Sequence, residues 1–81
     1  MRIVLNKVFF IEITKMSGMK TYVGKDIEEI YSSLDTIDTS LGLPNEFEAK
    51  SRIEEVKKYI KNTGIMATKI DVVSCNKKRG T

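Results

Sequence analysis

A capped helix followed at once by a strand is the feature of this 81-residue sequence that most limits its fold. Asn45 with Glu48 three residues later is a typical N-cap pattern, and Gly64 suits the left-handed position after a helix. Between them the apolar side chains are spaced by four, three and four residues, as on one helix face: Ala49, Ile53, Val56 and Ile60. The sequence therefore predicts a helix over residues 45–62 and a strand over 65–75.

Two strands and another helix are expected before this unit. Residues 2–14 are rich in β-branched and aromatic side chains, which favours a strand, and residues 20–23 follow as a short second strand after a turn at Gly18. Asp26 and Glu29 repeat the N-cap pattern. Apolar residues then recur at helical steps as far as Gly42: Ile27, Ile30, Tyr31, Leu34, Ile37 and Leu41. This helix has many Ser, Thr and Asp residues, so tertiary packing must stabilise it.

These elements predict an α+β fold in the order β-β-α-α-β. We expect a three-stranded sheet with both helices packed on one face and the last strand beside the first. Residues 1–76 are interpreted as a single domain, and residues 77–81 as a basic, flexible C-terminal tail.

Composition argues against several kinds of chemistry. The chain has no histidine, which removes imidazole catalysis and the common zinc-finger spacings. Cys75 is its only cysteine, so there is no disulfide framework, and a free cysteine suits a reducing compartment. No apolar stretch reaches the length of a membrane-spanning helix. We therefore expect a cytoplasmic protein that is not an enzyme, with no cofactor and no metal site.

Charge is sorted along the chain. Residues 26–49 hold seven acidic and no basic residues, whereas the flanking segments carry all fourteen Lys and Arg residues. Two interpretations stay open at this point. The acidic segment balances basic neighbours within the fold, or it forms a surface that meets a basic partner and orients its association.

The second interpretation gives the main functional hypothesis. We expect a small regulator or inhibitor that works by protein–protein contact through the acidic helix, using Glu28, Glu29, Asp35 and Asp38. Abundant Lys and Ile with little Ala and Arg suggest an AT-rich genome. We therefore expect the source to be a low-GC bacterium or one of its phages or other mobile elements. Met16 and Met19 flank Gly18 in an exposed turn, where flexible apolar side chains suit contact with a partner.

The alternative hypothesis is a nucleic-acid-binding module. Its residues would be the lysines of the second helix and the basic tail: Lys50, Lys57, Lys61, Lys77, Lys78 and Arg79. Phosphate binding requires little beyond such a patch, but Glu54 interrupts it and arginine, which reads bases, is scarce. Exposed strand edges would also allow a homodimer.

Overall fold

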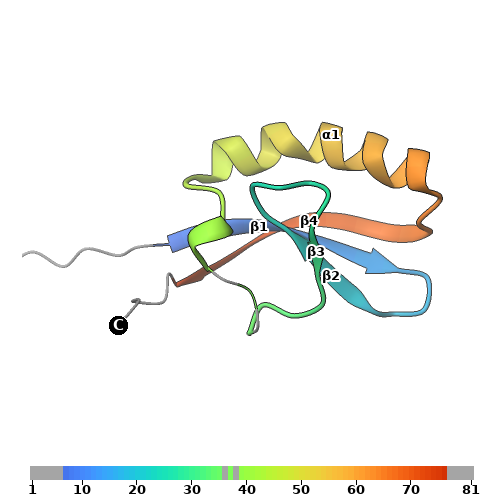
Figure 1. Ribbon diagram of the computed structural model, residues 1–81, viewed down its shortest axis with the longest axis horizontal. Coiled ribbons are helices and arrows are strands. Elements are labelled where there is room, and N and C mark those ends of the chain that lie inside the picture. The colour runs from blue at the N-terminus through green and yellow to red at the C-terminus, as the bar shows by residue number, and fades with distance from the viewer. Residues whose placement is uncertain (1–6, 36, 38, 77–81) are drawn as a thin grey trace, which may run out of the picture.

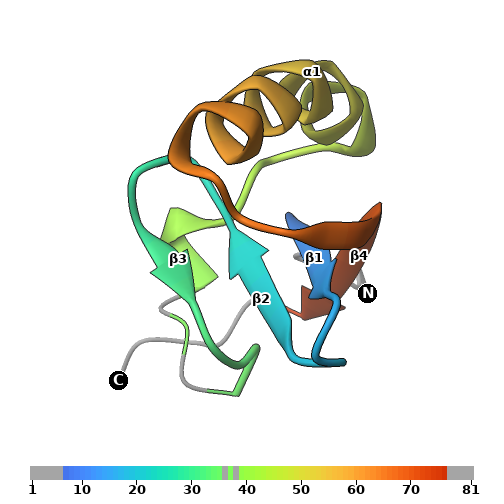
Figure 2. The same cartoon turned by 90° about the vertical axis from the view of Figure 1, so that its right-hand side faces the viewer.

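The computed structural model describes residues 7–35, 37 and 39–76. Its elements are β1 (Lys7–Lys15), β2 (Lys20–Val23), β3 (Ile30–Tyr31), the 3-10 helix η1 (Thr39–Leu41), α1 (Glu46–Thr63) and β4 (Ala67–Asn76). The strands form one antiparallel sheet in the order β3-β2-β1-β4, with α1 packed across one face (Figures 1 and 2). The predicted α+β class is confirmed, but the described residues contain four strands and one α-helix instead of three and two.

The centre of the sheet agrees with the sequence prediction. β4 lies antiparallel beside β1 along most of its length, from the pair Lys7–Asn76 to the pair Lys15–Ala67. The β1–β2 hairpin turns at Gly18, whose φ of 91° is in the region that glycine adopts readily. β3 and β4 are therefore the two outer strands of the sheet (Figure 2).

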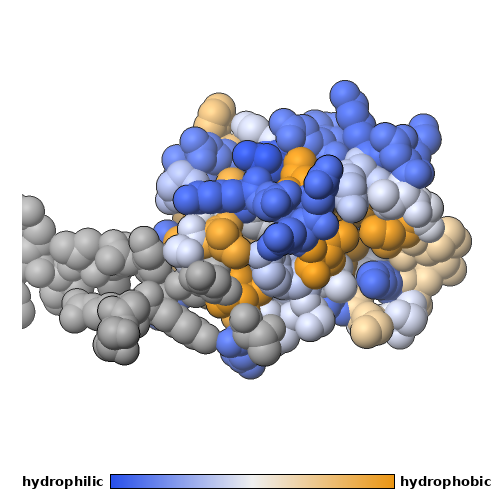
Figure 3. Space-filling model, in the orientation of Figure 1, coloured by the Kyte–Doolittle hydropathy of each residue, from blue (hydrophilic) through white to orange (hydrophobic). Residues whose placement is uncertain are grey.

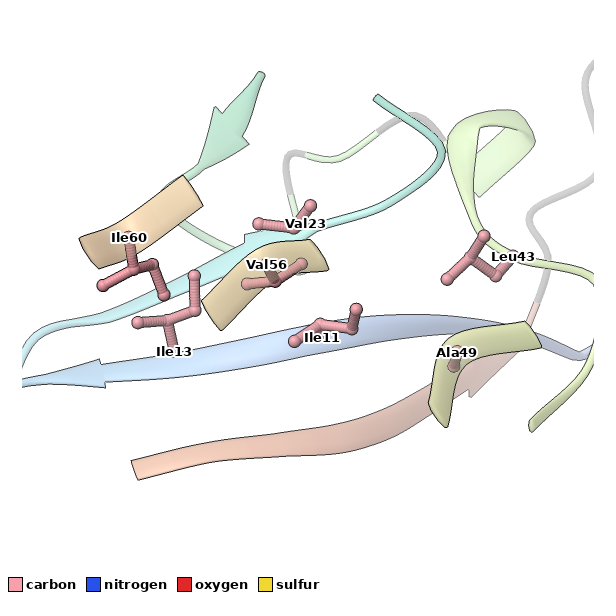
Figure 4. Packing of buried hydrophobic residues seen from close by; sticks show 7 residues of the cluster. All are labelled: Ile11, Ile13, Val23, Leu43, Ala49, Val56 and Ile60. Atoms are coloured by element: carbon pink, nitrogen blue, oxygen red, sulfur yellow. The ribbon is translucent and has the colours of Figure 1, made fainter. Parts of the chain in front are cut away.

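The predicted helix is present and its caps are where the sequence placed them. The Asn45 side chain accepts a hydrogen bond from the Glu48 N–H at 2.8 Å, and Gly64, at φ 80°, donates its N–H to the Ile60 carbonyl. One face of α1 is buried against the inner strands (Figure 4). The core on this face comprises Ile11, Ile13, Val23, Leu43, Ala49, Val56 and Ile60.

The helix predicted between Asp26 and Gly42 is wrong. The Asp26 carboxylate accepts a hydrogen bond from the Glu28 N–H at 3.0 Å, which closes a turn, and Ile30 and Tyr31 then pair with β2 as the outer strand β3. Ile27 and Ile30 pack on the α1 side of the sheet. The apolar residues that follow pack on the other side: Tyr31, Leu34 and Ile37.

The chain thus passes around the β3 edge, and Tyr31, Leu34 and Ile37 cover the face opposite α1. The prediction that both covering elements share one face is wrong for the same reason. A second core forms there around Val8, Phe10, Tyr22 and Ile37, and Phe10 is fully buried within it.

The chain then returns to β1 before entering α1. Leu43 and Phe9 exchange both main-chain hydrogen bonds, at 2.8 and 2.9 Å, and the Lys25 N–H donates to the Leu41 carbonyl at 2.7 Å. Gly42 lies so close to β1 that a Cβ atom there would be 2.5 Å from the Val8 Cβ. A glycine is required at this position because the side chains of Val8 and Phe10 occupy the space that a Cβ atom would need.

Candidate functional site

The acidic residues singled out in the sequence lie along the β3 edge, on a loop and a turn instead of a helix. Glu28 and Glu29 belong to the β2–β3 connection, and Asp35 belongs to the turn after β3. All three are exposed, as is Asp26; Asp38 lies outside the described residues. We call Asp26, Glu28, Glu29 and Asp35 the acidic edge. On the side that carries β3, hydrophilic surface covers α1 and hydrophobic patches lie below it (Figure 3).

Three of the four residues of the acidic edge have no oppositely charged partner among the described residues. Within residues 7–35, 37 and 39–76, Asp26, Glu28 and Glu29 form no ion pair; the pairs that do form involve Glu12, Glu46, Glu55 and Asp71. Asp26 and Glu29 accept hydrogen bonds from neighbouring residues, from the Glu28 N–H and the Tyr31 hydroxyl respectively. Neither contact cancels a charge. Glu46, which belongs to the same acidic segment of the sequence, does pair with Lys50, so both interpretations of the charge sorting stay open.

Two tyrosines connect the acidic edge to the sheet. Tyr22 and Tyr31 are cross-strand neighbours; the Tyr31 hydroxyl donates to Glu29 at 2.7 Å and the Tyr22 hydroxyl to Glu12 at 3.2 Å. Burial raises the pKa of Tyr22, and the hydrogen bond and charge of Glu12 and the charge of Asp35 raise it further. Only the contributions of Glu12 and Asp35 reflect negative charge near the Tyr22 hydroxyl, because burial raises the pKa of a tyrosine without any neighbouring charge.

A bound metal ion has no support from this geometry. In the part of the chain that the structure describes, no group of three His, Cys, Asp or Glu residues is arranged to hold one. Exposed carboxylates can also accept charge-assisted hydrogen bonds from cationic side chains.

The two turn methionines are exposed and have a third methionine beside them. Met16 and Met19 are 65% and 59% exposed, and Met66, in the connection between α1 and β4, is 65% exposed. The Met16 N–H donates to the Met66 carbonyl at 3.2 Å. A shallow depression of about 330 Å³ lies between the two connections, lined by Lys15, Met16, Ser17, Ile65 and Met66.

The lysines of α1 lie on the flank of the helix that faces β4. Lys50 lines a groove between α1 and β4 and pairs with Glu46 at 2.9 Å. Lys57 and Lys61 follow seven and eleven residues later, which places them on the same flank. They are exposed, and within the described residues they form no ion pair. The remaining predicted residues of this patch, Lys77, Lys78 and Arg79, lie outside the described residues.

Sequence reasoning missed Met66 and the two tyrosines as parts of these surfaces. Met66 is separated from the turn methionines by about fifty residues, and only the pairing of β1 with β4 brings them together. A signal for Tyr22 and Tyr31 was present in the acidic residues around them, but it could not be used while residues 26–42 were assigned to a helix.

No protein-family model matches the chain, and no curated protein or solved structure is significantly similar to it. Over the described residues, none of the helical structure has the length and apolar character needed to cross a membrane.

Proposed function

We propose that this chain is a non-enzymatic binding protein whose acidic edge contacts a basic surface on a partner protein. The observation that carries the proposal is that Asp26, Glu28 and Glu29 are exposed and without an ion pair in the described fold. Such charges repel one another and contribute little to stability. A complementary surface would convert this repulsion into attraction, which increases the association rate and fixes the orientation of the complex.

The proposed contact is an arginine or lysine side chain of the partner, lying against Glu29 and Asp35 beside Tyr31. Charge-assisted hydrogen bonds to carboxylates are stronger than neutral ones, and an aromatic ring nearby adds a favourable surface for a cation. Met16, Met19 and Met66 offer a second, adaptable apolar surface to the same partner or to another.

A regulator or inhibitor is the form of binding protein that fits best, encoded by a phage or another mobile element. Such a protein acts by occupying a surface of its target and needs no reactive group of its own. The lack of histidine supports the non-enzymatic interpretation. So does Cys75, which is partly buried against the second core and is not presented as a nucleophile.

Affinity capture followed by mass spectrometry tests the proposal. The bait would be incubated with an extract of the source organism or its host, and the partner's affinity then measured with purified protein. The double variant Glu28→Lys/Glu29→Lys is expected to weaken binding about tenfold or more, because reversed charges repel a basic surface. Glu54→Lys/Glu55→Lys on α1 makes the same change in net charge elsewhere and is expected to bind like the wild type. Equal affinity for all three proteins, each shown to be folded, would refute the role of the acidic edge.

Nucleic-acid binding remains a second proposal because Lys57 and Lys61 are exposed and unpaired within the described chain. A gel-shift assay at low salt separates it from the first. Electrostatic binding to phosphates is strongest there and falls steeply as salt is added. Retardation of DNA or RNA that disappears in Lys57→Glu/Lys61→Glu would support it, and no retardation at low salt would dismiss it.

A further inference from the structure

The outer edge of β4 carries main-chain groups that no described strand pairs. Phe9 directs its N–H and carbonyl to Leu43, so the alternation of an antiparallel ladder directs those of Phe10 and Glu12 to β4. Their partners on β4 are Val73 and Asp71. The residues between and beside these partners therefore point their N–H and carbonyl groups away from β1, along an open edge: Ile70, Val72 and Ser74.

A hydrogen bond at Val72 indicates that the outward-facing N–H groups of this edge donate to an oxygen partner. The Asp71 carboxylate turns back and takes a hydrogen bond from the Val72 N–H at 3.0 Å. The Asp71 carboxylate oxygen thus lies where the carbonyl oxygen of a further strand would lie if the sheet were extended beyond β4. A short local contact of this kind is easily exchanged for a regular ladder, because Asp71 is exposed and also lies 3.6 Å from the Lys69 ammonium.

A groove with a mixed lining runs beside the same edge. It has a volume of about 280 Å³, and α1 and β4 provide most of its walls. Phe9, Ile53 and Val72 supply apolar surface. The charged residues of the lining are already paired, Lys50 with Glu46 at 2.9 Å and Asp71 with Lys69 at 3.6 Å. Farther along the same flank of α1, Lys57 and Lys61 are exposed and form no ion pair within the described residues. An added strand would therefore find main-chain partners and an apolar floor, with two uncompensated positive charges beside them.

We propose that the β4 edge binds an extended acidic segment of a partner protein, which adds to the sheet as a fifth strand. Main-chain hydrogen bonds to Ile70, Val72 and Ser74 would supply affinity. Acidic side chains on the α1 side of the added strand would meet Lys57 and Lys61, and these contacts would supply specificity. The partner chemistry is thus opposite to that at the acidic edge, and this site stands or falls independently of the proposed function.

A second copy of this chain fits the edge less well. Both copies would pair through Ile70, Val72 and Ser74, so both α1 helices would lie on the same face of the joined sheet. A two-fold axis brings identical surfaces together, and here it would set the flank with Lys57 and Lys61 against itself. Like charges facing each other destabilise such a contact, whereas an acidic strand relieves their repulsion.

The experiment is an NMR titration of the whole chain with an eight-residue peptide of alternating Glu and Val, blocked at both ends. We expect the largest amide shifts at Ile70, Val72 and Ser74. Lys57→Glu is expected to weaken binding about fivefold, since it reverses one partly screened charge at the rim. Lys58→Glu is the matched control, because it makes the same change on the neighbouring, outward-facing position of α1. A peptide of alternating Lys and Val should bind at least about tenfold more weakly.

Peptides with methyl groups on alternate amide nitrogens test the strand geometry without changing the protein. Two such peptides are possible, one methylated at the odd and one at the even positions, and in an added strand only one of these sets of N–H groups faces β4. The peptide methylated at that set should lose binding, and the other should keep it. Equal binding by the two, or no shift at Ile70, Val72 and Ser74 with the unmodified peptide, would overturn the proposal. So would amide protection at β4 that grows with protein concentration alone, because it would identify a second copy as the occupant.

Discussion

The helix α1 and the segment from residue 26 to residue 42 carry the same sequence signals and fold differently. Each begins with an Asx residue followed three positions later by Glu, and each continues with apolar residues at helical spacing. One forms eighteen residues of helix, and the other forms a turn, two residues of strand and a short 3-10 helix. The comparison shows which signals decide between these outcomes.

The caps already differ in their geometry. Asn45 bonds the N–H three residues ahead, as a helix N-cap does, whereas Asp26 bonds the N–H only two residues ahead, as in a turn. The interiors differ more. α1 is rich in Glu and Lys, which are good helix formers, but residues 32–40 consist largely of Ser, Thr and Asp, which compete for backbone hydrogen bonds and weaken a helix. A cap pattern alone therefore does not establish a helix.

The demands of the sheet explain the rest of the difference. β1 has apolar side chains on both faces, and α1 covers only one of them. The apolar residues of the segment 26–42 divide between the two cores. Ile27 and Ile30 pack on the α1 side of the sheet, and Leu34 and Ile37 cover the face that α1 leaves open. Apolar residues spaced by three and four positions are typical of a helix, but the same spacing is found here in a chain that crosses the edge of a sheet and packs on both of its faces.

Truncation of Ile37 tests whether the segment 26–42 packs against the sheet. Ile37 is 2% exposed, so Ile37→Ala is expected to lower the free energy of unfolding by about 2–4 kcal/mol. Val56→Ala in α1 is the matched change in the other core, with a loss of about 1–3 kcal/mol for its smaller side chain. Urea denaturation measures both. A cost below about 1 kcal/mol for Ile37→Ala would mean that the segment does not pack against the sheet.

Substitution of Gly42 tests the return of the chain to β1. A methyl group there would meet the Val8 Cβ, so Gly42→Ala is expected to cost about 1–3 kcal/mol through displacement of the backbone. The control is Gly64→Ala at the end of α1, where open space surrounds the new Cβ and only the φ of 80° is unfavourable, at about 1 kcal/mol. If Gly42→Ala were the milder of the two in thermal unfolding, the close approach to Val8 would be refuted.

The sequence predicted the elements that local rules determine. Asn45 and Gly64 mark α1 to within one residue, Gly18 marks the hairpin turn, and the strand after α1 pairs with β1. It did not predict β3, because two residues of strand have too little periodicity to detect and acquire their structure from pairing with β2. The sequence identified most residues of the candidate surfaces but did not predict where in the fold they lie. The acidic residues were expected on a helix, and Met66 joined the methionine turn only through the β1–β4 pairing.

Two serine substitutions, one in α1 and one in the segment 26–42, are expected to change stability in opposite directions. Ser51 is exposed within α1, so Ser51→Ala is expected to stabilise the protein by about 0.5 kcal/mol through helix propensity. The Ser33 hydroxyl accepts a hydrogen bond from the Asp35 N–H at 3.1 Å, so Ser33→Ala is expected to destabilise it by about 0.5–1 kcal/mol. If residues 26–42 formed a helix, both changes would stabilise. Differential scanning calorimetry of the two variants against the wild type decides between these results.

The dependence of stability on alkaline pH reports on Tyr22, at the junction between the sheet and the acidic edge. Its folded-state pKa is raised, chiefly by burial and then by Glu12 and Asp35, whereas the unfolded tyrosine titrates near 10. Above about pH 10 the unfolded state therefore releases this proton more readily, and the stability present at lower pH is lost as the pH rises toward the folded pKa. Tyr22→Phe removes this loss while keeping the ring. In urea denaturation at pH 8, 10 and 11, the free energy of unfolding of the wild type should fall relative to that of Tyr22→Phe as the pH rises. If the two free energies changed in parallel, Tyr22 would ionise as freely in the folded protein as in the unfolded chain.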